Sequence, residues 1–295
     1  MKHLSVSAQA RRRMREIQIY TRRLLRGFLI GDGRSAIRGS GFEFDQIREY
    51  REGDDIRFID WKASARSNQL LLKEYIEERS RRIILCVDVS KSSSFGSGSQ
   101  TKADFMAEVA AVIALVSDNR KDRVGLVLFS DEVEFYLPPG RGLQHVHVIM
   151  EYLLGYTSSR SGTSIGSVLK WLGRFSWRDA VICILSDFID TGADYSQQLV
   201  HIAKRHDLVA LRIFDKRERF IPSVGLVTVQ DSETGELVLL DTRKSHNGHI
   251  NSCLREWHER QDYMFKRSGV DLLDLPTDRS FALDLMRFFR KRTRL

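Results

Sequence analysis

One carboxylate and two hydroxyls follow directly on a continuous apolar run in the first third of the chain. The run, residues 83–87, is rich in β-branched residues and is typical of a parallel strand buried on both faces. It leads into Asp88, Ser90 and Ser92. In open α/β sheets, ligands collect outside the carboxyl ends of the strands. Hard oxygen donors with few carboxylates suit Mg²⁺, so the pattern predicts a magnesium site with open coordination positions.

Two later segments offer further oxygens of the same kind. The sequence Ser-Gly-Thr-Ser at residues 161–164 opens a helical pattern and supplies the hydroxyl of Thr163. The apolar run 180–185 ends in Ser186 and Asp187, a second carboxylate at a strand end. Each of these side chains could instead cap a helix, and only their joint arrangement favours a metal.

The ordered set resembles the metal-ion-dependent adhesion site, or MIDAS, of von Willebrand factor A domains. It consists of Asp-x-Ser-x-Ser, a distant Gly-Thr and a hydrophobic strand that ends in Ser-Asp. The resemblance implies that Asp88 anchors the cation directly or through water, with Ser90 and Ser92 as hydroxyl ligands. It assigns Thr163 a contact that changes with conformation, and Asp187 the role of accepting hydrogen bonds from metal-bound water. The implied ion is Mg²⁺, with Mn²⁺ or Ca²⁺ left open, and an acidic residue of a partner protein fills its open position.

Strand and helix patterns that could position these residues alternate from residue 83 onward. Strands are predicted at 83–87, 124–129, 133–137, 180–185, 208–213 and 270–273. Helices are predicted at 102–119, 143–154, 164–175, 195–205, 245–266 and 280–290. This alternation predicts an α/β fold with a mostly parallel, doubly wound sheet. Residues 225–242 interrupt the rhythm with two apolar runs that predict an inserted hairpin.

The N-terminal part of the chain differs in composition from the rest. Residues 6–29 have an amphipathic helical pattern between arginines. The charged stretch 34–80, with a strand expected at 70–76, is too polar to form a core of its own. We therefore expect a basic helix and an extended arm over residues 1–80, and a von Willebrand factor A-like domain with a C-terminal extension over 81–295.

The arm carries a second resemblance, which covers three segments. They read Arg-Gly-Ser-Gly-Phe-Glu-Phe (38–44), Arg-Glu-Tyr-Arg-Glu-Gly-Asp-Asp (48–55) and Arg-Phe-Ile-Asp-Trp-Lys-Ala-Ser-Ala-Arg (57–66). They resemble the signature of the bacterial DUF58 family, in which this motif runs into an A-type domain. Membership implies a partner, because such proteins are commonly encoded beside AAA+ ATPases of the MoxR type. The pair is thought to act in chaperone-like remodelling or metal-centre maturation.

Acidic and basic side chains alternate through the arm. This mixture predicts an ion-paired network, with Phe58 and Trp61 anchoring the arm on the main sheet. The network could be a docking surface for the ATPase or a structural clamp. A second metal site in the arm is disfavoured, because basic side chains lie between the acidic ones.

Composition narrows the class of protein. The chain of 295 residues is 42% hydrophobic and 29% charged, as in a soluble globular protein. No apolar run approaches the ~20 residues of a membrane helix, and no signal-peptide pattern precedes the helix, so we expect a cytoplasmic protein. The three cysteines, Cys86, Cys183 and Cys253, lack the spacing of a zinc site or a disulfide framework.

Two other functions remain open beside metal-dependent protein binding. The net charge of +8 is concentrated near the two ends of the chain, which could bind nucleic acid or another anionic surface. A Mg²⁺-dependent hydrolase is conceivable, because one metal with open positions can activate water. No phosphate-binding loop motif is present, and no histidine is tied by a motif to Ser90 or Ser92. We therefore predict a non-enzymatic, divalent-cation-dependent adaptor that works with a MoxR-type ATPase or a client protein.

Overall fold

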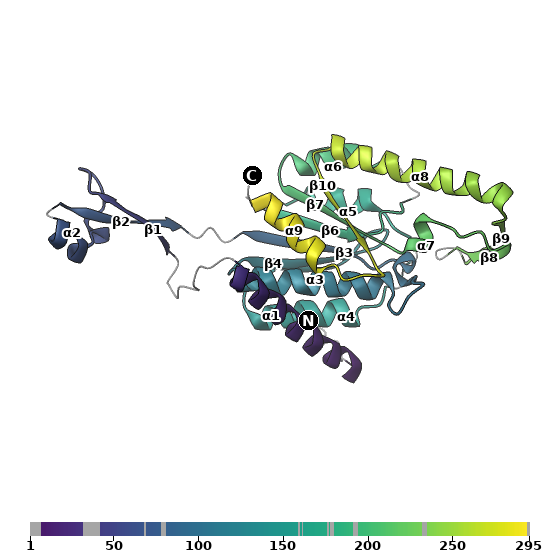
Figure 1. The fold of residues 1–295 in the computed structure, drawn as a ribbon, viewed down its shortest axis with the longest axis horizontal. Helices are drawn as coiled ribbons and strands as arrows, with labels where there is room; N and C mark the ends of the chain where they lie inside the picture. The colour runs from purple at the N-terminus through teal and green to yellow at the C-terminus, as the bar shows by residue number, and fades with distance from the viewer. Residues whose placement is uncertain are drawn as a thin grey trace. The chain divides into compact units, whose positions relative to one another are not determined.

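The structure is a computed structural model (Figure 1). It describes residues 7–31, 42–67, 69–77, 81–158, 160, 162–175, 177, 180–190, 194–231 and 235–293. The chain forms two compact units, one of Met1–Arg26 with Arg81–Leu295 and one of Gly27–Ser80. The first 26 residues therefore group with the larger unit, whereas the sequence-based division placed residues 1–80 together.

A six-stranded sheet forms the centre of the larger unit. Its strands are β3 (Arg82–Asp88), β4 (Arg123–Phe129), β5 (Val133–Gly140), β6 (Ala180–Ser186), β7 (Asp207–Phe214) and β10 (Asp271–Pro276). Their order is β10-β7-β6-β3-β4-β5, and only β5 runs antiparallel to its neighbour. The predicted strands and the mostly parallel sheet are thus confirmed. From β3 the chain first builds the sheet toward β5 and then returns to its other side, so β3 and β6 flank the topological switch point.

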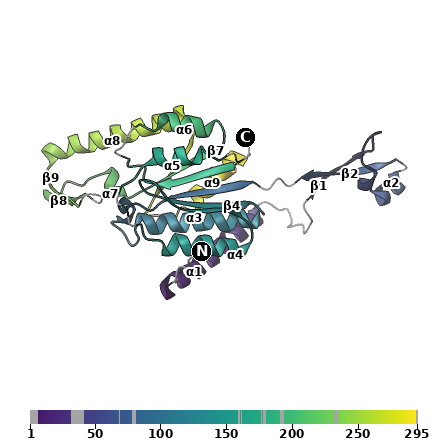
Figure 2. The same ribbon diagram turned by 180° about the vertical axis from the view of Figure 1, so that it is seen from behind.

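Helices cover both faces of this sheet (Figures 1 and 2). They are α1 (Ala8–Gly31), α3 (Lys102–Asn119), α4 (Leu143–Gly155), α5 (Ile165–Leu172), α6 (Ser196–Ala203), α8 (Lys244–Arg267) and α9 (Ala282–Thr293). Alternate residues of β3 enter two separate cores, because successive side chains of a strand point to opposite faces. Leu85 packs with α1, α3, α4 and α9, whereas Ile84 packs with α5, α6 and α8. The predicted helices are confirmed at all these places.

The smaller unit contains a hairpin and short helices. Strand β1 (Phe42–Glu49) pairs with β2 (Leu71–Glu77), and η1 (Ile56–Phe58) and α2 (Trp61–Ser67) lie between them in the chain. The strand expected at 70–76 is confirmed, whereas β1 and α2 were not predicted. The side chain of Arg48 binds both carboxylate oxygens of Asp54, so ion pairs are indeed present. Trp61 is 67% exposed and Phe58 37% exposed, and the anchoring role predicted for these two aromatic residues stays a prediction.

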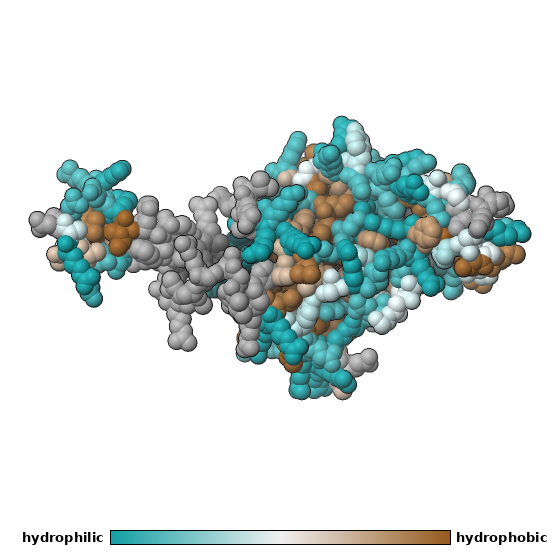
Figure 3. Space-filling view, viewed as in Figure 1, coloured by the Kyte–Doolittle hydropathy of each residue, from teal (hydrophilic) through white to brown (hydrophobic). Residues whose placement is uncertain are grey.

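The insertion predicted at 225–242 is a hairpin of β8 (Leu226–Gln230) and β9 (Leu237–Asp241), which pair only with each other among the described residues. It follows the short helix α7 (Lys216–Arg219). Large aliphatic side chains are exposed along both strands, and Figure 3 shows them as an apolar area over β8 and β9. This hairpin therefore contributes little to the core.

Candidate metal centre

The two predicted carboxylates lie at neighbouring strand ends. Asp88 is the last residue of β3, Asp187 directly follows β6, and both are buried. The hydroxyl of Ser186 donates a hydrogen bond of 2.6 Å to Asp88 Oδ2 and accepts one of 2.9 Å from the backbone N–H of Phe188. Strand pairing at the switch point thus brings together residues that lie almost a hundred positions apart.

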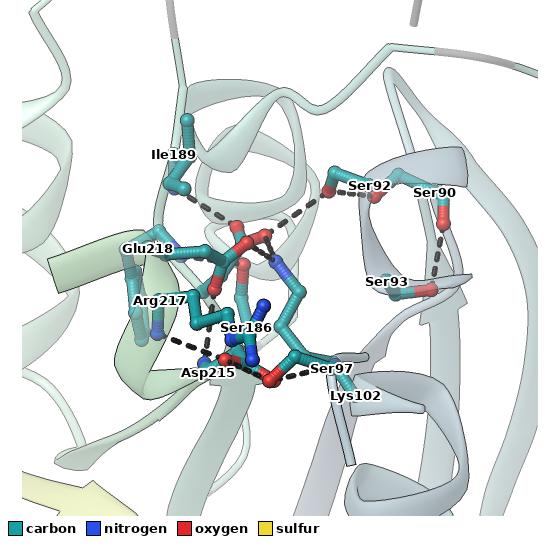
Figure 4. Close-up of polar contacts among 12 residues, drawn as sticks. Ser90, Ser92, Ser93, Ser97, Lys102, Ser186, Ile189, Asp215, Arg217 and Glu218 are labelled. Atoms are coloured by element: carbon teal, nitrogen blue, oxygen red, sulfur yellow. Dashed lines mark hydrogen bonds and ion pairs between the residues drawn. The ribbon is translucent and has the colours of Figure 1, made fainter. Parts of the chain in front are cut away.

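The predicted serine hydroxyls form a chain of contacts between these carboxylates. The backbone N–H of Ser90 donates to Asp88 Oδ1 at 2.9 Å. The Oγ atoms of Ser90 and Ser92 are 3.0 Å apart, and Ser92 Oγ donates to Asp187 Oδ2 at 3.1 Å. A short 3-10 helix, η2 (Lys91–Ser94), turns both serines toward the site (Figure 4). Four of the five predicted positions therefore form one connected group of oxygens.

Thr163, the fifth position, carries an unusual hydroxyl. Its Oγ1 atom is buried and has no hydrogen-bond partner among the described residues. The next residues are fixed from both sides, because Ser164 N–H donates to Ser130 O after β4 and Ile165 N–H donates to Asp190 Oδ2 after β6. The N-terminus of α5 thereby spans the strands on either side of β3. A buried hydroxyl without a partner costs about 1–3 kcal/mol, which favours a ligand for Thr163 other than the described residues.

A lysine that sequence reasoning missed completes the cluster. The side chain of Lys102 is 0% exposed, and its Nζ atom lies 2.6 Å from Asp187 Oδ2 and 2.5 Å from Glu218 Oε1. Lys102 is the first residue of α3, directly after the N-cap Thr101. At such a place a lysine normally extends into solvent. The available signal was the long apolar stretch of α3 between Phe105 and Val116, interrupted only by Glu108, which indicates a largely buried helix.

Burial dominates the electrostatics of this cluster. It raises the pKa of Asp88 to about 7, and the charge of Asp187 adds to this effect, although hydrogen bonds from Ser186 and Ser90 oppose it. Burial alone would lower the pKa of Lys102, but Asp187 and Glu218 outweigh it and the net direction is upward. Burial also raises the pKa of Glu218, against the opposing effect of Lys102. Two buried carboxylates at adjacent strand ends thus favour a positive charge between them.

Further hydrogen bonds tie α7 to the loop that carries the serines. Asp215 caps α7 and accepts hydrogen bonds from the backbone N–H of Ser97 at 2.7 Å and from its hydroxyl at 2.8 Å. Glu218 Oε2 in turn accepts a bond of 3.0 Å from the Asp215 N–H. Figure 4 shows Ser97, Lys102, Asp215 and Glu218 converging from the loop, α3 and α7. The site is therefore held by three elements besides the sheet.

The donors fit a small, hard divalent cation. They are hydroxyl and carboxylate oxygens, the ligand types that Mg²⁺ and Mn²⁺ prefer, and the unpartnered Thr163 hydroxyl agrees with this chemistry. Within the described ranges, no three or more His, Cys, Asp or Glu side chains come together in a metal-binding group. Any ion at this site would consequently depend on the serines and the threonine. The individual ligand assignments stay predictions.

The chain matches the family described as "Protein of unknown function DUF58" over residues 46–255. It is 27% identical over 283 residues to the protein named "Uncharacterized protein Rv1480" of Mycobacterium tuberculosis, covering 95% of this chain and 89% of that protein. None of the helices in the described part of the chain is long and apolar enough to cross a membrane.

Solved structures with a similar arrangement include von Willebrand factor A domains. BatB from Bacteroides thetaiotaomicron aligns with a TM-score of 0.46 at 13% identity, covering 73% of this chain and all of that one. The SpRpn10 VWA domain aligns with a TM-score of 0.39 at 14% identity, covering 70% of this chain and 94% of that one.

Proposed function

Because the chain belongs to the DUF58 family and has a von Willebrand factor A-like fold, we propose that it is a non-enzymatic protein-binding adaptor whose binding depends on a divalent cation. The observation that carries this proposal is the oxygen cluster at the switch point. It joins two buried carboxylates and two linked serine hydroxyls. The buried hydroxyl of Thr163, which has no hydrogen-bond partner among the described residues, adds support. Such a set suits cation binding better than nucleophilic chemistry.

Asp88, Ser90, Ser92 and Thr163 would hold the cation, with Asp187 beside it. Once bound, the cation would offer an open coordination position to a carboxylate of a partner protein. The chain itself fixes the orientation of Asp187, because Asp187 Oδ1 accepts a hydrogen bond of 3.0 Å from the backbone N–H of Ile189. Ser90 and Ser92 are oriented by each other, and Ser92 also by Asp187, so that both hydroxyls would be available to one cation.

The surface at α7 supports an acidic partner. A hollow at α7 has a volume of ≈ 360 Å³, which lies near the lower end of the roughly 300–1,000 Å³ found for ligand pockets. Its lining combines three basic with three apolar residues: Lys216, Arg217, Arg219, Phe214, Phe220 and Pro222. Glu218, the remaining residue of α7, contacts Lys102 of the candidate metal centre. Lys216 pairs with Asp278 and Arg219 pairs with Asp274. The positive charge of Arg217 would attract a partner that also presents a carboxylate.

We further propose that this partner is a MoxR-type AAA+ ATPase or a client protein, and that the pair acts in chaperone-like remodelling or maturation. Support for the ATPase comes from the DUF58 signature in the smaller unit. Its ion pairs, such as Lys73 with Asp60 at 3.1 Å, would present a fixed pattern of charge for docking. The acidic ligand for the cation could come from either protein.

Calorimetric titration with Mg²⁺ and Mn²⁺ tests the metal dependence. We expect the wild type to bind one ion and Asp88→Ala to lose binding while remaining folded by circular dichroism. Asp207→Asn is the matched control, because Asp207 lies at the opposite end of the sheet and pairs with Arg292. Equal ion binding by wild type and Asp88→Ala would place any metal elsewhere and contradict the proposal.

A further inference from the structure

Lys102 occupies a place where a buried ammonium is costly. It begins α3, and the N-terminus of a helix carries partial positive charge that repels a cation. Its side chain is entirely buried, and removing a charge from water costs several kcal/mol unless close partners compensate. Both partners are carboxylates: Asp187, whose Oδ2 atom also accepts a hydrogen bond from Ser92, and Glu218. One oxygen of Asp187 is thus shared by a candidate ligand and an ammonium.

We propose that Lys102 is a built-in cation that competes with the divalent ion for Asp187 and thereby sets the metal affinity of the site. This inference rests on the proposed function of the same site. With both carboxylates ionised, Asp187, Glu218 and Lys102 together carry one negative charge, whereas the two carboxylates alone would carry two. Charges a few ångströms apart interact strongly even at an effective dielectric constant of about 20, so the ammonium weakens the attraction for a second cation.

Glu218, the second carboxylate that contacts Lys102, allows Lys102 to stay ion-paired during this competition. When a bound ion competes for the negative charge of Asp187, Lys102 keeps its ion pair with Glu218, which α7 holds through the Asp215 N–H. The lysine therefore need not become an unpaired buried charge.

A weak site of this kind would depend on its partner. An incoming carboxylate supplies the negative charge that Lys102 has neutralised, so the ion and the acidic partner strengthen each other's binding reciprocally. The adaptor would then hold its cation firmly only while an acidic partner is engaged.

A charge-ranked series of variants tests the inference by titration with Mn²⁺ alone. Lys102→Met leaves two negative charges at Asp187 and Glu218, and Glu218→Gln leaves none in the trio. The double variant Lys102→Met/Glu218→Gln restores the single negative charge of the wild type and serves as the matched control. We expect Lys102→Met to bind Mn²⁺ about tenfold or more tightly than wild type, the double variant to resemble wild type, and Glu218→Gln to bind more weakly.

Thermal unfolding provides a second readout. Lys102→Met should melt at a lower temperature than wild type in EDTA, because its two buried carboxylates face each other without a cation, and Mn²⁺ should restore much of the loss. Should Lys102→Met fail to fold, weaker Mn²⁺ binding by Glu218→Gln still supports the inference and unchanged binding overturns it.

The possible failures can be told apart. One outcome is that wild type binds Mn²⁺, Asp88→Ala does not, and the Mn²⁺ affinities of the Lys102 and Glu218 variants do not follow their charge. In that case the role proposed for Lys102 is wrong and the metal-dependent adaptor stands. If no variant binds Mn²⁺, both are wrong.

Discussion

Thr163 shows at the scale of a single residue why the cluster favours a metal. Asp88, Ser90, Ser92 and Asp187 all have hydrogen-bond partners within the protein, whereas the Thr163 hydroxyl is buried with none among the described residues. A fold retains such a group more readily when a ligand satisfies it.

Replacement of Thr163 by valine tests this view. Valine has nearly the same shape without the hydroxyl, so Thr163→Val should keep or raise stability in EDTA, by up to about 1 kcal/mol. The increase in melting temperature that Mg²⁺ gives the wild type should shrink in this variant. Thr163→Ser keeps the hydroxyl and should therefore keep the full increase in melting temperature with Mg²⁺. A Thr163→Val protein that Mg²⁺ stabilises as strongly as wild type would exclude Thr163 as a ligand.

His258 on α8 gives a second residue-scale prediction, which concerns pH. Burial lowers its pKa to about 4, with Arg219 and Arg212 acting in the same direction. In the unfolded chain histidine titrates near 6.5, so the unfolded state takes up the proton first and stability falls as the pH drops from about 6.5 toward 4. The raised pKa of Asp88 acts oppositely across this whole range, because the folded state takes up that proton first.

The contribution of His258 is therefore measured as a difference. Urea unfolding of wild type and His258→Gln is measured at pH 7.5 and at pH 5. The free energy of unfolding should fall more between these two pH values in wild type than in the variant. If the two proteins lose the same stability between these pH values, the lowered pKa of His258 is wrong.

At the scale of elements, the segment between β3 and α3 determines the geometry of the site. It carries Ser90 and Ser92, is fixed to α7 through Ser97, and ends at Lys102. Gly96 lies within it, and a Cβ atom there would lie 2.5 Å from the backbone oxygen of Gln100. The loop can follow this path only without a side chain at that position.

Gly96→Ala should therefore disturb the site from a distance. We expect a loss of stability of roughly 1–3 kcal/mol, since the clash is with backbone, together with weaker Mn²⁺ binding. Gly98→Ala is the control, because a Cβ atom there would meet nothing within 4 Å. Denaturant unfolding of both variants measures the loss of stability, and titration with Mn²⁺ measures the change in metal affinity. Wild-type behaviour of Gly96→Ala in both measurements would show that the loop path is not critical.

The same segment marks what the sequence could and could not predict. Local patterns sufficed for the strands and helices of the main sheet, because buried strands and amphipathic helices have distinct periodicities. Parallel pairing then brings Asp88 and Asp187 to one edge. By contrast, the contact between Lys102 and Glu218 joins residues 116 positions apart through the packing of α7, which no local pattern encodes. Strand β1 was missed because its apolar and charged residues alternate only in part, and a register shift between Phe44 and Gln46 breaks the period of two.

At the scale of the whole molecule, internal contacts reduce the basic character expected at the two ends of the chain. Arg13 pairs with Asp104 on α3, and Arg292 pairs with Asp207 and Asp271 at the sheet. Part of the positive charge thus stabilises the packing of α1 and α9, which weakens the case for an open nucleic-acid-binding surface.

The hairpin of β8 and β9 stands outside the main core. Leu237 and Leu239 are both exposed on it, so Leu237→Ser/Leu239→Ser should change the free energy of unfolding by no more than about 0.5 kcal/mol per substitution. Leu126→Ala, in the fully buried strand β4, should cost about 2–5 kcal/mol. Urea unfolding of both variants makes the comparison. A large loss from the hairpin variant would show that its aliphatic side chains are covered within the protein.

Capture of partners by the immobilised protein tests the central claim most directly. Wild type and Asp88→Ala are exposed to lysate of the source organism in Mg²⁺ and in EDTA, and the retained proteins are identified by mass spectrometry. We expect a MoxR-type ATPase or a client protein to be retained by wild type in Mg²⁺, and to be lost both in EDTA and with Asp88→Ala. Retention of the same proteins under all four conditions would contradict a metal-dependent adaptor.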